Sequence, residues 1–553
     1  MSENISKKKR ELLIQRIDEI KAFISACPQD EQTSRLDGYL TELAAELNGK
    51  RYGLVFEEHR ERIDEILSEA LPVLDELRDL RVNGGERTNS IIEGDNLAAL
   101  DILTRTHGGR IDIIYIDPPY NTGKNDFVYD DKFVCDDDLF SHSKWLSFMN
   151  KRLVFARKLL AETGVIFISI DDNEQAALKL LCDRVFGAEN FLACVCVKGN
   201  PRGRQSSAYF AKVHDFLLVY RKSAAAELQG FDIDAEQKKK RFNKTDEGGE
   251  SYEEWELRKR GADSRREDSP NLWFPIYYDE DTGEISTVRT RLTDIEITPK
   301  LSDGTDGRWR WSREKVECEK SKLYVRKTKS GGYNVYERKY IEEKPRQKAP
   351  TIWDYPEVNT ELGTKLLKSV LGEKAFDFPK PIGLLTRILS MVKKDATVLD
   401  FFAGSGTTGH AVMSMNAADG GSRRFILCTN NQNNICREVT YERLKRVILS
   451  DNYRESIRYY KIDFVDTKDK LYYEYADELL RRIIPLIELE NGEIGETAVA
   501  FTEDELDEAV KGGCGTVYLG HDVLPSEYAE TEISARGIIV NVIPDYYYGA
   551  EKR

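Results

Sequence analysis

Residues 111–120, Ile-Asp-Ile-Ile-Tyr-Ile-Asp-Pro-Pro-Tyr, join an apolar run to a rigid polar turn. The apolar run predicts a strand buried on both faces. Two successive prolines fix φ and remove two backbone donors, so the turn Asp117–Tyr120 is stiff. A helical pattern over 143–162 follows, Gly164 ends it, and Val165–Ile170 predicts the next strand. This order predicts a parallel sheet covered by helices, with the turn at the carboxyl edge where such sheets bind ligands.

A second junction of strand and turn lies much later in the chain. Residues 397–402 predict a strand that runs into the glycine-rich turn 403–409 and then a helix, and Arg424–Thr429 predicts a further strand. Glycines let the backbone approach a ligand closely, and the start of the following helix offers unpaired amides. The turn is not G-x-G-x-x-G, and no Gly-Lys-Ser/Thr follows it, which excludes a phosphate-binding P-loop. Taken alone, each junction also fits an ordinary turn in any α/β protein.

The composition sets limits on function. The chain has 553 residues and a net charge of −15, so it is not a general binder of polyanions, although a local basic surface is compatible with this charge. Nine scattered Cys and six His form no metal-ligand spacing, and we expect reduced thiols and no metal. No apolar run approaches the ~20 residues that cross a membrane. We therefore expect a cytoplasmic protein without a membrane anchor.

Changes in residue pattern divide the chain into five regions. Apolar residues recur every three or four positions over 1–82, as far as Leu71 and Leu74, which predicts helices. The interior of the chain alternates strand and helix patterns, interrupted by a charged, aromatic and relatively basic segment. The predicted regions are a helical N-terminal region 1–88, a first α/β half 89–223, an insert 224–350, a second α/β half 351–465, and a small C-terminal module 466–553.

The two junctions become specific in combination. Asp117–Tyr120 and Asp400–Gly406, in this order and separated by a charged insert, resemble the motifs of amino-methylating DNA methyltransferases of the β arrangement. The resemblance covers roughly 89–465, and Asp117–Gly123 looks most like the modification subunits of type III restriction systems. It implies an α/β fold: a Rossmann-like S-adenosylmethionine-dependent methyltransferase core with a mostly parallel sheet and helices on both faces. The insert, the helical N-terminus and the small C-terminal module would be additions to this core.

The resemblance also implies a set of site residues. The family often places a ribose-binding carboxylate after the strand at 424–429, but here the run is Asn430–Asn434, so Gln432 is only a candidate for that role. The implied catalytic residues are Asp117, Pro118, Pro119 and Tyr120, and the implied cofactor-binding residues are Asp95, Asn96, Lys380, Asp400, Phe402, Gly404, Ser405, Gly406, Thr407, Thr408 and Gln432.

By resemblance, the chain transfers a methyl group from S-adenosylmethionine to the N6 amine of a flipped adenine in double-stranded DNA. Asp rather than Ser at position 117 favours adenine over cytosine N4, and the absence of a Pro-Cys dipeptide disfavours carbon-5 cytosine methylation. A homodimer and a separate ATPase and nuclease restriction subunit are implied partners. Three alternatives stay open: an RNA amine methyltransferase, a cytosine-N4 amine methyltransferase, and a DNA-binding scaffold with a degenerate core. Candidate DNA contacts in and beside the insert are Arg202, Arg204, Arg308, Arg310 and Arg313, with Trp309 and Trp311 between them.

Overall fold

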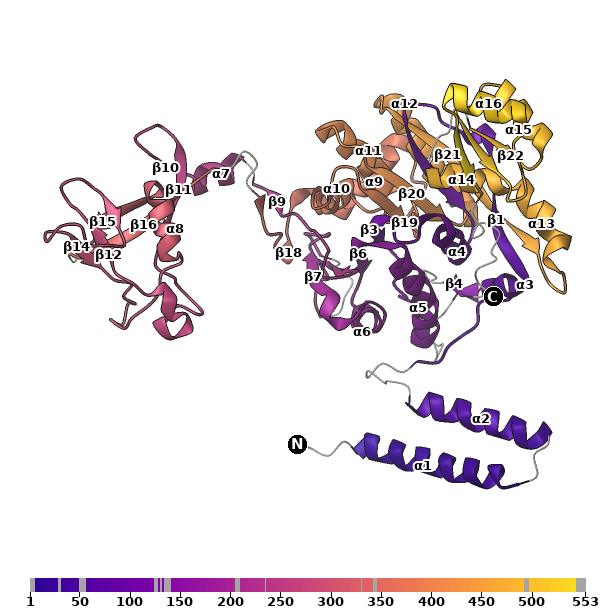
Figure 1. Ribbon diagram of the computed structural model, residues 1–553, viewed down its shortest axis with the longest axis horizontal. Helices are drawn as coiled ribbons and strands as arrows, with labels where there is room; N and C mark the ends of the chain where they lie inside the picture. Colours follow the sequence, from indigo (N-terminus) through magenta and orange to yellow (C-terminus); the bar gives the residue numbers. More distant parts are fainter. Residues whose placement is uncertain are drawn as a thin grey trace. The chain divides into compact units, whose positions relative to one another are not determined.

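A ten-stranded mixed sheet forms the core of the larger of two compact units in the computed structural model (Figure 1). The structure describes residues 5–27, 31–48, 56–123, 128–129, 132–133, 141–203, 209–233, 235–329, 331–341, 346–491 and 497–543. In sheet order the strands are β1 (Ala70–Glu76), β21 (Glu455–Asp466), β2 (Arg87–Glu93), β20 (Arg424–Thr429), β19 (Thr397–Asp400), β3 (Ile111–Ile116), β6 (Leu160–Ile170), β8 (Asp215–Arg221), β7 (Phe191–Val197) and β18 (Ile352–Trp353).

The six central strands from β21 to β6 are parallel to one another. Strands of the first and second α/β halves alternate in the sheet: β2 lies between β21 and β20, and β19 pairs with β3, with Val398 opposite Ile113 and Leu399 opposite Ile114. Since both strands are parallel, the turns after Ile116 and after Asp400 leave the same edge of the sheet. The predicted doubly covered α/β core is confirmed.

Helices cover both faces of this sheet (Figure 1). The strands β3 and β19 are almost entirely buried, as continuous apolar runs in a parallel sheet require. The helices α4, α5 and α6 pack in succession, α10 packs on α11, and α9 and α11 pack on α12. Their bounds are α4 (Asn96–His107), α5 (Ser141–Leu159), α6 (Gln175–Phe186), α9 (Thr360–Leu371), α10 (Ile382–Ser390), α11 (Thr407–Asp419) and α12 (Glu442–Ser450).

The N-terminal region contains a strand where helix was expected. Helices α1 (Ile5–Ser25), α2 (Glu31–Asn48) and α3 (Arg62–Glu69) are present, but the predicted helix through Leu71 and Leu74 is wrong. Residues 70–76 form β1, which pairs antiparallel with β21. The run contains Pro72, which cannot continue a helix interior, and its pairing partner lies almost 400 residues away, beyond the reach of a local pattern.

Two smaller parts have their own sheets. The segment Gln229–Ala349 is a separate compact unit with a four-stranded sheet, a three-stranded sheet and a buried core. The C-terminal part, which belongs to the same unit as the central sheet, contains the three-stranded parallel sheet β22 (Thr497–Ala500), β23 (Thr516–Leu519) and β24 (Ile539–Val542). It also contains α13 (Tyr472–Arg481), α14 (Ile483–Asn491), α15 (Glu503–Lys511) and α16 (Glu527–Arg536).

The helices and strands of the unit Gln229–Ala349 are short. Its four-stranded sheet is β10 (Lys244–Thr245), β11 (Ser251–Glu256), β16 (Tyr333–Tyr340) and β15 (Leu323–Lys327), and its three-stranded sheet is β13 (Ile285–Ser286), β12 (Ile276–Tyr278) and β14 (Ile295–Ile297). Helices α7 (Ala235–Arg241) and α8 (Arg313–Cys318) complete it, and β9 (Phe231–Asp232) pairs with β17 (Arg346–Gln347) close to the two ends of the unit. A further hairpin pairs β4 (Val128–Tyr129) with β5 (Lys132–Phe133) in the first unit.

Candidate active site

The predicted catalytic turn leaves the carboxyl end of β3. The Tyr120 hydroxyl donates a hydrogen bond to Asp117 Oδ1 at 2.8 Å, so the first and last side chains of the turn are joined. Trp145 on α5, which is completely buried, donates its indole N–H to the Pro119 carbonyl at 2.7 Å. The turn is therefore fixed both by its two prolines and by a neighbouring helix.

Lys380 lies between the carboxylates of this site. Its Nζ is 2.6 Å from the Tyr120 hydroxyl, 3.3 Å from Asp117 Oδ1 and 3.7 Å from Asp215 Oδ2. Asp215 begins β8 and was not among the sequence-predicted site residues. The structure thus places Lys380, predicted to bind the cofactor, against the catalytic turn.

These contacts control the charge of Asp117. Burial raises the pKa of the Asp117 carboxyl above its usual value, while Lys380 and the Tyr120 hydroxyl act against that rise. Burial by itself would lower the pKa of Lys380, but Asp117 and Asp215 together raise it. An ammonium that stays charged is thereby held beside a carboxyl group that burial would otherwise neutralise.

A second group of polar side chains holds the residue after the turn. Asn121 has a φ of 57°, and its side-chain amide donates to Glu174 Oε1 at 2.6 Å. Ser141, at the start of α5, donates to the Asn121 side-chain oxygen at 2.9 Å, and His142 Nδ1 lies 2.6 Å from Glu174 Oε1. Burial raises the pKa of Glu174, whose side chain is fully enclosed. The sequence pattern included Asn121 in the stretch Asp117–Gly123 but gave it no role, and no motif pointed to Glu174; the two side chains come together only in the folded chain.

The glycine-rich turn follows β19 on the neighbouring strand. Gly404 and Gly406 have φ of 48° and 72°, which L side chains rarely adopt. A Cβ at Gly404 would lie 3.2 Å from the Phe376 ring, and one at Gly406 would lie 3.2 Å from Thr440 Cγ2. The backbone conformation therefore favours glycine at both positions, and a side chain at either one would also require Phe376 or Thr440 to shift.

Asp400 stabilises the same turn through two hydrogen bonds of its carboxylate. Its Oδ1 accepts the Phe402 backbone N–H at 3.0 Å and its Oδ2 accepts the Thr408 hydroxyl at 2.5 Å. Burial raises the pKa of Asp400 to about 7, although both hydrogen bonds oppose the rise. Ser405 and Thr407 are buried as well, where the Arg443 guanidinium donates to the Ser405 carbonyl and to Thr407 Oγ1. Ser405, Thr407 and Thr408 thus hold the turn from its interior side.

The start of α4 lies beside this turn. Asp95 caps α4 by accepting the Leu97 N–H at 2.7 Å, and its side chain is 40% exposed. Asn96 donates to the Phe401 carbonyl at 3.0 Å. Phe402 is partly buried, with its ring centroid 5.9 Å from that of Phe148. An exposed carboxylate, an aromatic ring and a close-approach glycine turn meet here, which fits the sulfonium cation and the adenosine of S-adenosylmethionine.

The position expected to bind the cofactor ribose carries the amide side chain of Gln432 in place of the carboxylate that the family often has. Gln432 is exposed in the turn after β20. The acidic side chain nearest in register to the end of β20 is Glu93, opposite Thr429, but it accepts from Arg437 at 2.7 Å and from the Tyr459 hydroxyl at 2.6 Å. Its charge is already balanced, so the assignment of Gln432 stays a prediction.

The candidate DNA contacts in the insert are only partly on the surface. Trp309 and Trp311, which alternate with the candidate arginines, are 2% and 4% exposed and belong to the core of the unit Gln229–Ala349, so they do not lie on its surface. Trp309 donates to the Phe274 carbonyl, which explains how a buried indole N–H is satisfied. Arg310 lies 3.3 Å from Glu337. Arg204 lies outside the described residues.

Neither a metal cluster nor a membrane span is found in the described part of the chain. Among those residues, no three or more His, Cys, Asp or Glu side chains are grouped as metal ligands would be. No described helix combines the length and the apolarity that crossing a bilayer requires.

Comparisons with known proteins agree with this geometry. Residues 111–439 match the model of a family described as DNA methylase. The type II methyltransferase M.KpnI of Klebsiella pneumoniae is 38% identical over 72% of this chain and 93% of its own length. The Mod subunit of the type III restriction-modification enzyme EcoPI, from Escherichia phage P1, is 38% identical over 61% of this chain, which spans 57% of that subunit. Among solved structures, the cytosine-N4-specific PvuII DNA methyltransferase aligns with 65% of this chain and 88% of its own at 11% identity and a TM-score of 0.33.

Proposed function

The chain belongs to the DNA methylase family, and from this premise we propose that it methylates the N6 amine of adenine in double-stranded DNA, with S-adenosylmethionine as the methyl donor. The observation that supports this most is the position of Asp117 at the end of β3, beside the glycine-rich turn at the end of β19. A base held at the first turn and a cofactor held at the second would bring amine and methyl together.

The residues of the site have distinct roles in this proposal. Phe402, the backbone of Gly404–Gly406 and the Asp95 carboxylate would hold the cofactor, which supplies an electrophilic methyl group on sulfur. Asp117 would accept one hydrogen of the adenine amine, and the Pro118 carbonyl the other, since the Pro119 carbonyl already accepts from Trp145. Both bonds favour a tetrahedral nitrogen whose lone pair points at the methyl carbon. Asp117 would accept the surplus proton that the amine loses once it has been methylated.

The ring of Tyr120 would stack on the target base. Because the target amine is inaccessible inside the duplex, the adenine must flip out, at an expense of a few kcal/mol. In the structure the Tyr120 hydroxyl is bound between Asp117 and Lys380, which fixes the orientation of the ring before a base arrives. Lys380 would then keep Asp117 ionised and able to accept a hydrogen.

The choice of adenine depends on Asp117, since family members with Ser at this place tend to methylate cytosine N4. The likeness to type III Mod subunits supports a place in a restriction-modification system with a separate restriction subunit as partner, and a homodimer stays a prediction from the family resemblance. The chain contains no G-x-x-x-x-G-K-[S/T] motif for a motor's triphosphate. We therefore expect the protein alone to methylate DNA and not to cut it, and double-strand cleavage by the pure protein with ATP and magnesium would contradict this.

The test is to methylate unmodified DNA with labelled S-adenosylmethionine and to identify the methylated nucleoside by mass spectrometry. N6-methyladenine is expected, and N4-methylcytosine or a product on RNA alone would refute the proposal. Asp117→Ala should abolish transfer but keep cofactor binding measured by calorimetry. If the wild-type chain binds no cofactor, the degenerate scaffold becomes the better interpretation.

A further inference from the structure

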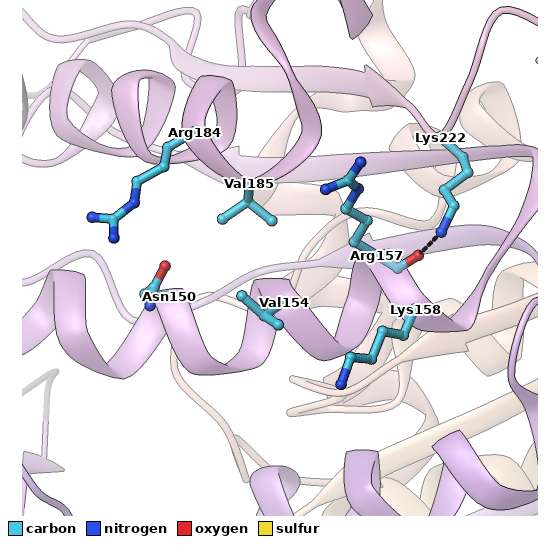
Figure 2. Close-up of a pocket in the computed structure, with 7 residues that line it drawn as sticks. All are labelled: Asn150, Val154, Arg157, Lys158, Arg184, Val185 and Lys222. Carbon is cyan, nitrogen blue, oxygen red and sulfur yellow. Dashed lines mark hydrogen bonds between the residues drawn. The ribbon is translucent and has the colours of Figure 1, made fainter. Parts of the chain in front are cut away.

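A cavity of about 470 Å³ lies on the outer side of α5 and α6, apart from the active site (Figure 2). Four cations surround it: Arg157 and Lys158 in the last turn of α5, Arg184 in the last turn of α6, and Lys222 just after β8. Val154 and Val185 supply apolar surface between them. No motif in the sequence marked these residues, since they come from three separate elements.

The cavity lies at the edge of the sheet opposite to the active site. Helix α5 begins with Ser141, which contacts Asn121 beside the catalytic turn, whereas the two cations that it contributes to the cavity are in its last turn. Strand β8 likewise begins with Asp215, which contacts Lys380, and ends directly before Lys222. A ligand in this cavity would not overlap the site of methyl transfer.

No acidic side chain of the described residues lines the cavity. Within the described residues, none of the four cations forms an ion pair with a carboxylate, whereas Lys151 and Lys179 on the same two helices pair with Asp64 and Asp183. The net charge of −15 makes four such cations at one cavity unusual.

The partners that the four cations do have are uncharged. Arg184 lies 5.8 Å above the ring of Phe56, Lys158 lies 5.4 Å from the ring of Phe155, and Lys222 donates to the Arg157 carbonyl. Burial and the charge of Arg157 lower the pKa of Lys222, against the opposing effect of Glu162. The helix dipoles explain a cation at each helix end, but they do not explain why the cations of three elements surround one cavity.

We propose that this cavity binds a phosphate ester. Two guanidinium groups match the paired oxygens of a phosphate, and two ammonium groups add charge for a second phosphate. The two valines would contact the apolar faces of a sugar or a base. The volume falls within the range of about 300–1,000 Å³ that small-ligand sites occupy. The phosphate ester comes either from a free nucleotide or from the backbone of DNA that flanks the methylated site.

The first experiment measures how tightly the protein binds a small free phosphate compound. Pyrophosphate is titrated into the full-length protein by calorimetry at low salt, and into the double variant Arg157→Gln/Lys158→Gln. We expect binding that weakens at least tenfold in the variant. The matched control, Lys365→Gln/Lys445→Gln, removes the same charge from exposed ion pairs on α9 and α12 and should bind as the wild type does.

The second experiment measures DNA affinity against salt concentration for the same proteins. If the cavity holds the DNA backbone, the slope of log affinity against log salt should fall by about 1 to 2 in the double variant, since each phosphate contact contributes about 0.9. Loss of pyrophosphate binding with an unchanged slope identifies a free nucleotide as the source, and a reduced slope identifies DNA. The proposal is overturned if both measurements equal those of the control. Arg184→Gln, on another helix, replaces the double variant if its melting temperature shows that it does not fold.

Discussion

Replacing Lys380 by Met should move the acidic limb of the pH–rate profile to higher pH. The proposed mechanism needs Asp117 as a carboxylate, so activity is present above the pKa of Asp117 and is lost below it. Burial raises this pKa and Lys380 opposes the rise, so removal of the ammonium raises the pKa further. Asp215, which Lys380 also neutralises, would then add repulsion.

The distance sets the size of the effect. Two opposite charges 3.3 Å apart attract by about 5 kcal/mol at an effective dielectric constant of about 20. The Asp117 side chain keeps 28% of its exposure, and water reduces the interaction by about half. The remaining ~2–3 kcal/mol corresponds to a shift of about 2 pH units. Lys380→Met should thus lose most activity at the acidic end of the pH range and recover in part as the pH rises.

The assay is single-turnover methyl transfer between pH 5.5 and 9. Lys380→Arg keeps the charge and should keep the wild-type limb. Lys393→Met is the matched control, because Lys393 pairs with Asp112 at 3.0 Å at the opposite end of β3. A loss of the same factor at every pH in Lys380→Met would refute the argument, since a group that acts through the charge of Asp117 must change the pH dependence.

Three further predictions concern the rest of the chain. Tyr120→Ala should lower kcat/KM by an amount equivalent to ~1–3 kcal/mol of lost base stacking. Tyr120→Phe, which keeps the ring, should have a milder effect. A Phe variant as inactive as the Ala variant would mean that the hydrogen bonds of the hydroxyl to Asp117 and Lys380 matter more than the ring. The pKa of Asp400 is raised to about 7 from a usual 3.8, so ionisation of this carboxyl opposes folding. The resulting loss in the free energy of unfolding is absent below pH ~4, grows between pH 4 and 7, and reaches about 4 kcal/mol above pH 7. Asp400→Asn should therefore flatten the loss of stability between pH 5 and 8 in denaturant titrations without cofactor, and an unchanged slope would contradict the shift. Exchange of 224–350 for the matching segment of a relative should change the methylated sequence but not the methylated atom, as sequencing of modified DNA would show; survival of the original site would place recognition elsewhere.

The sequence predicted the parts of the fold that local patterns determine. The strand 111–116 was predicted with its bounds, because a continuous apolar run before two prolines has clear ends. The helix expected over 143–162 extends over Ser141–Leu159 instead, and β6 begins at Leu160 rather than at Val165, since helix and strand compete at the ends of such a run. The strand β1 was missed because its apolar spacing resembles that of a helix, although Pro72 argues against one, and its pairing partner β21 is distant in sequence.

The residues of the candidate site likewise fall into two groups, those that a local sequence pattern marks and those that only the folded chain brings together. Asp117 and Gly404–Gly406 are contiguous motifs and could be found from residue type and spacing. Asp215, Asn121 and Glu174 could not be found, because each acts through a partner that is distant in sequence. The buried positions of Trp309 and Trp311 likewise follow from the packing of a whole unit, although their alternation with arginines suggested a surface.

The strand order also has a consequence for biosynthesis. Strand β2 has β20 and β21 as its two neighbours, and both leave the ribosome more than three hundred residues after it. At ~5–20 residues per second, both edges of β2 wait on the order of half a minute for their partners. Its buried Asn89 waits as long, since its amide bonds Glu455 and the backbone of Phe425. Nascent chains that end before Arg424 should therefore aggregate or occupy chaperones, whereas chains extended beyond Asp466 can close the centre of the sheet in one step.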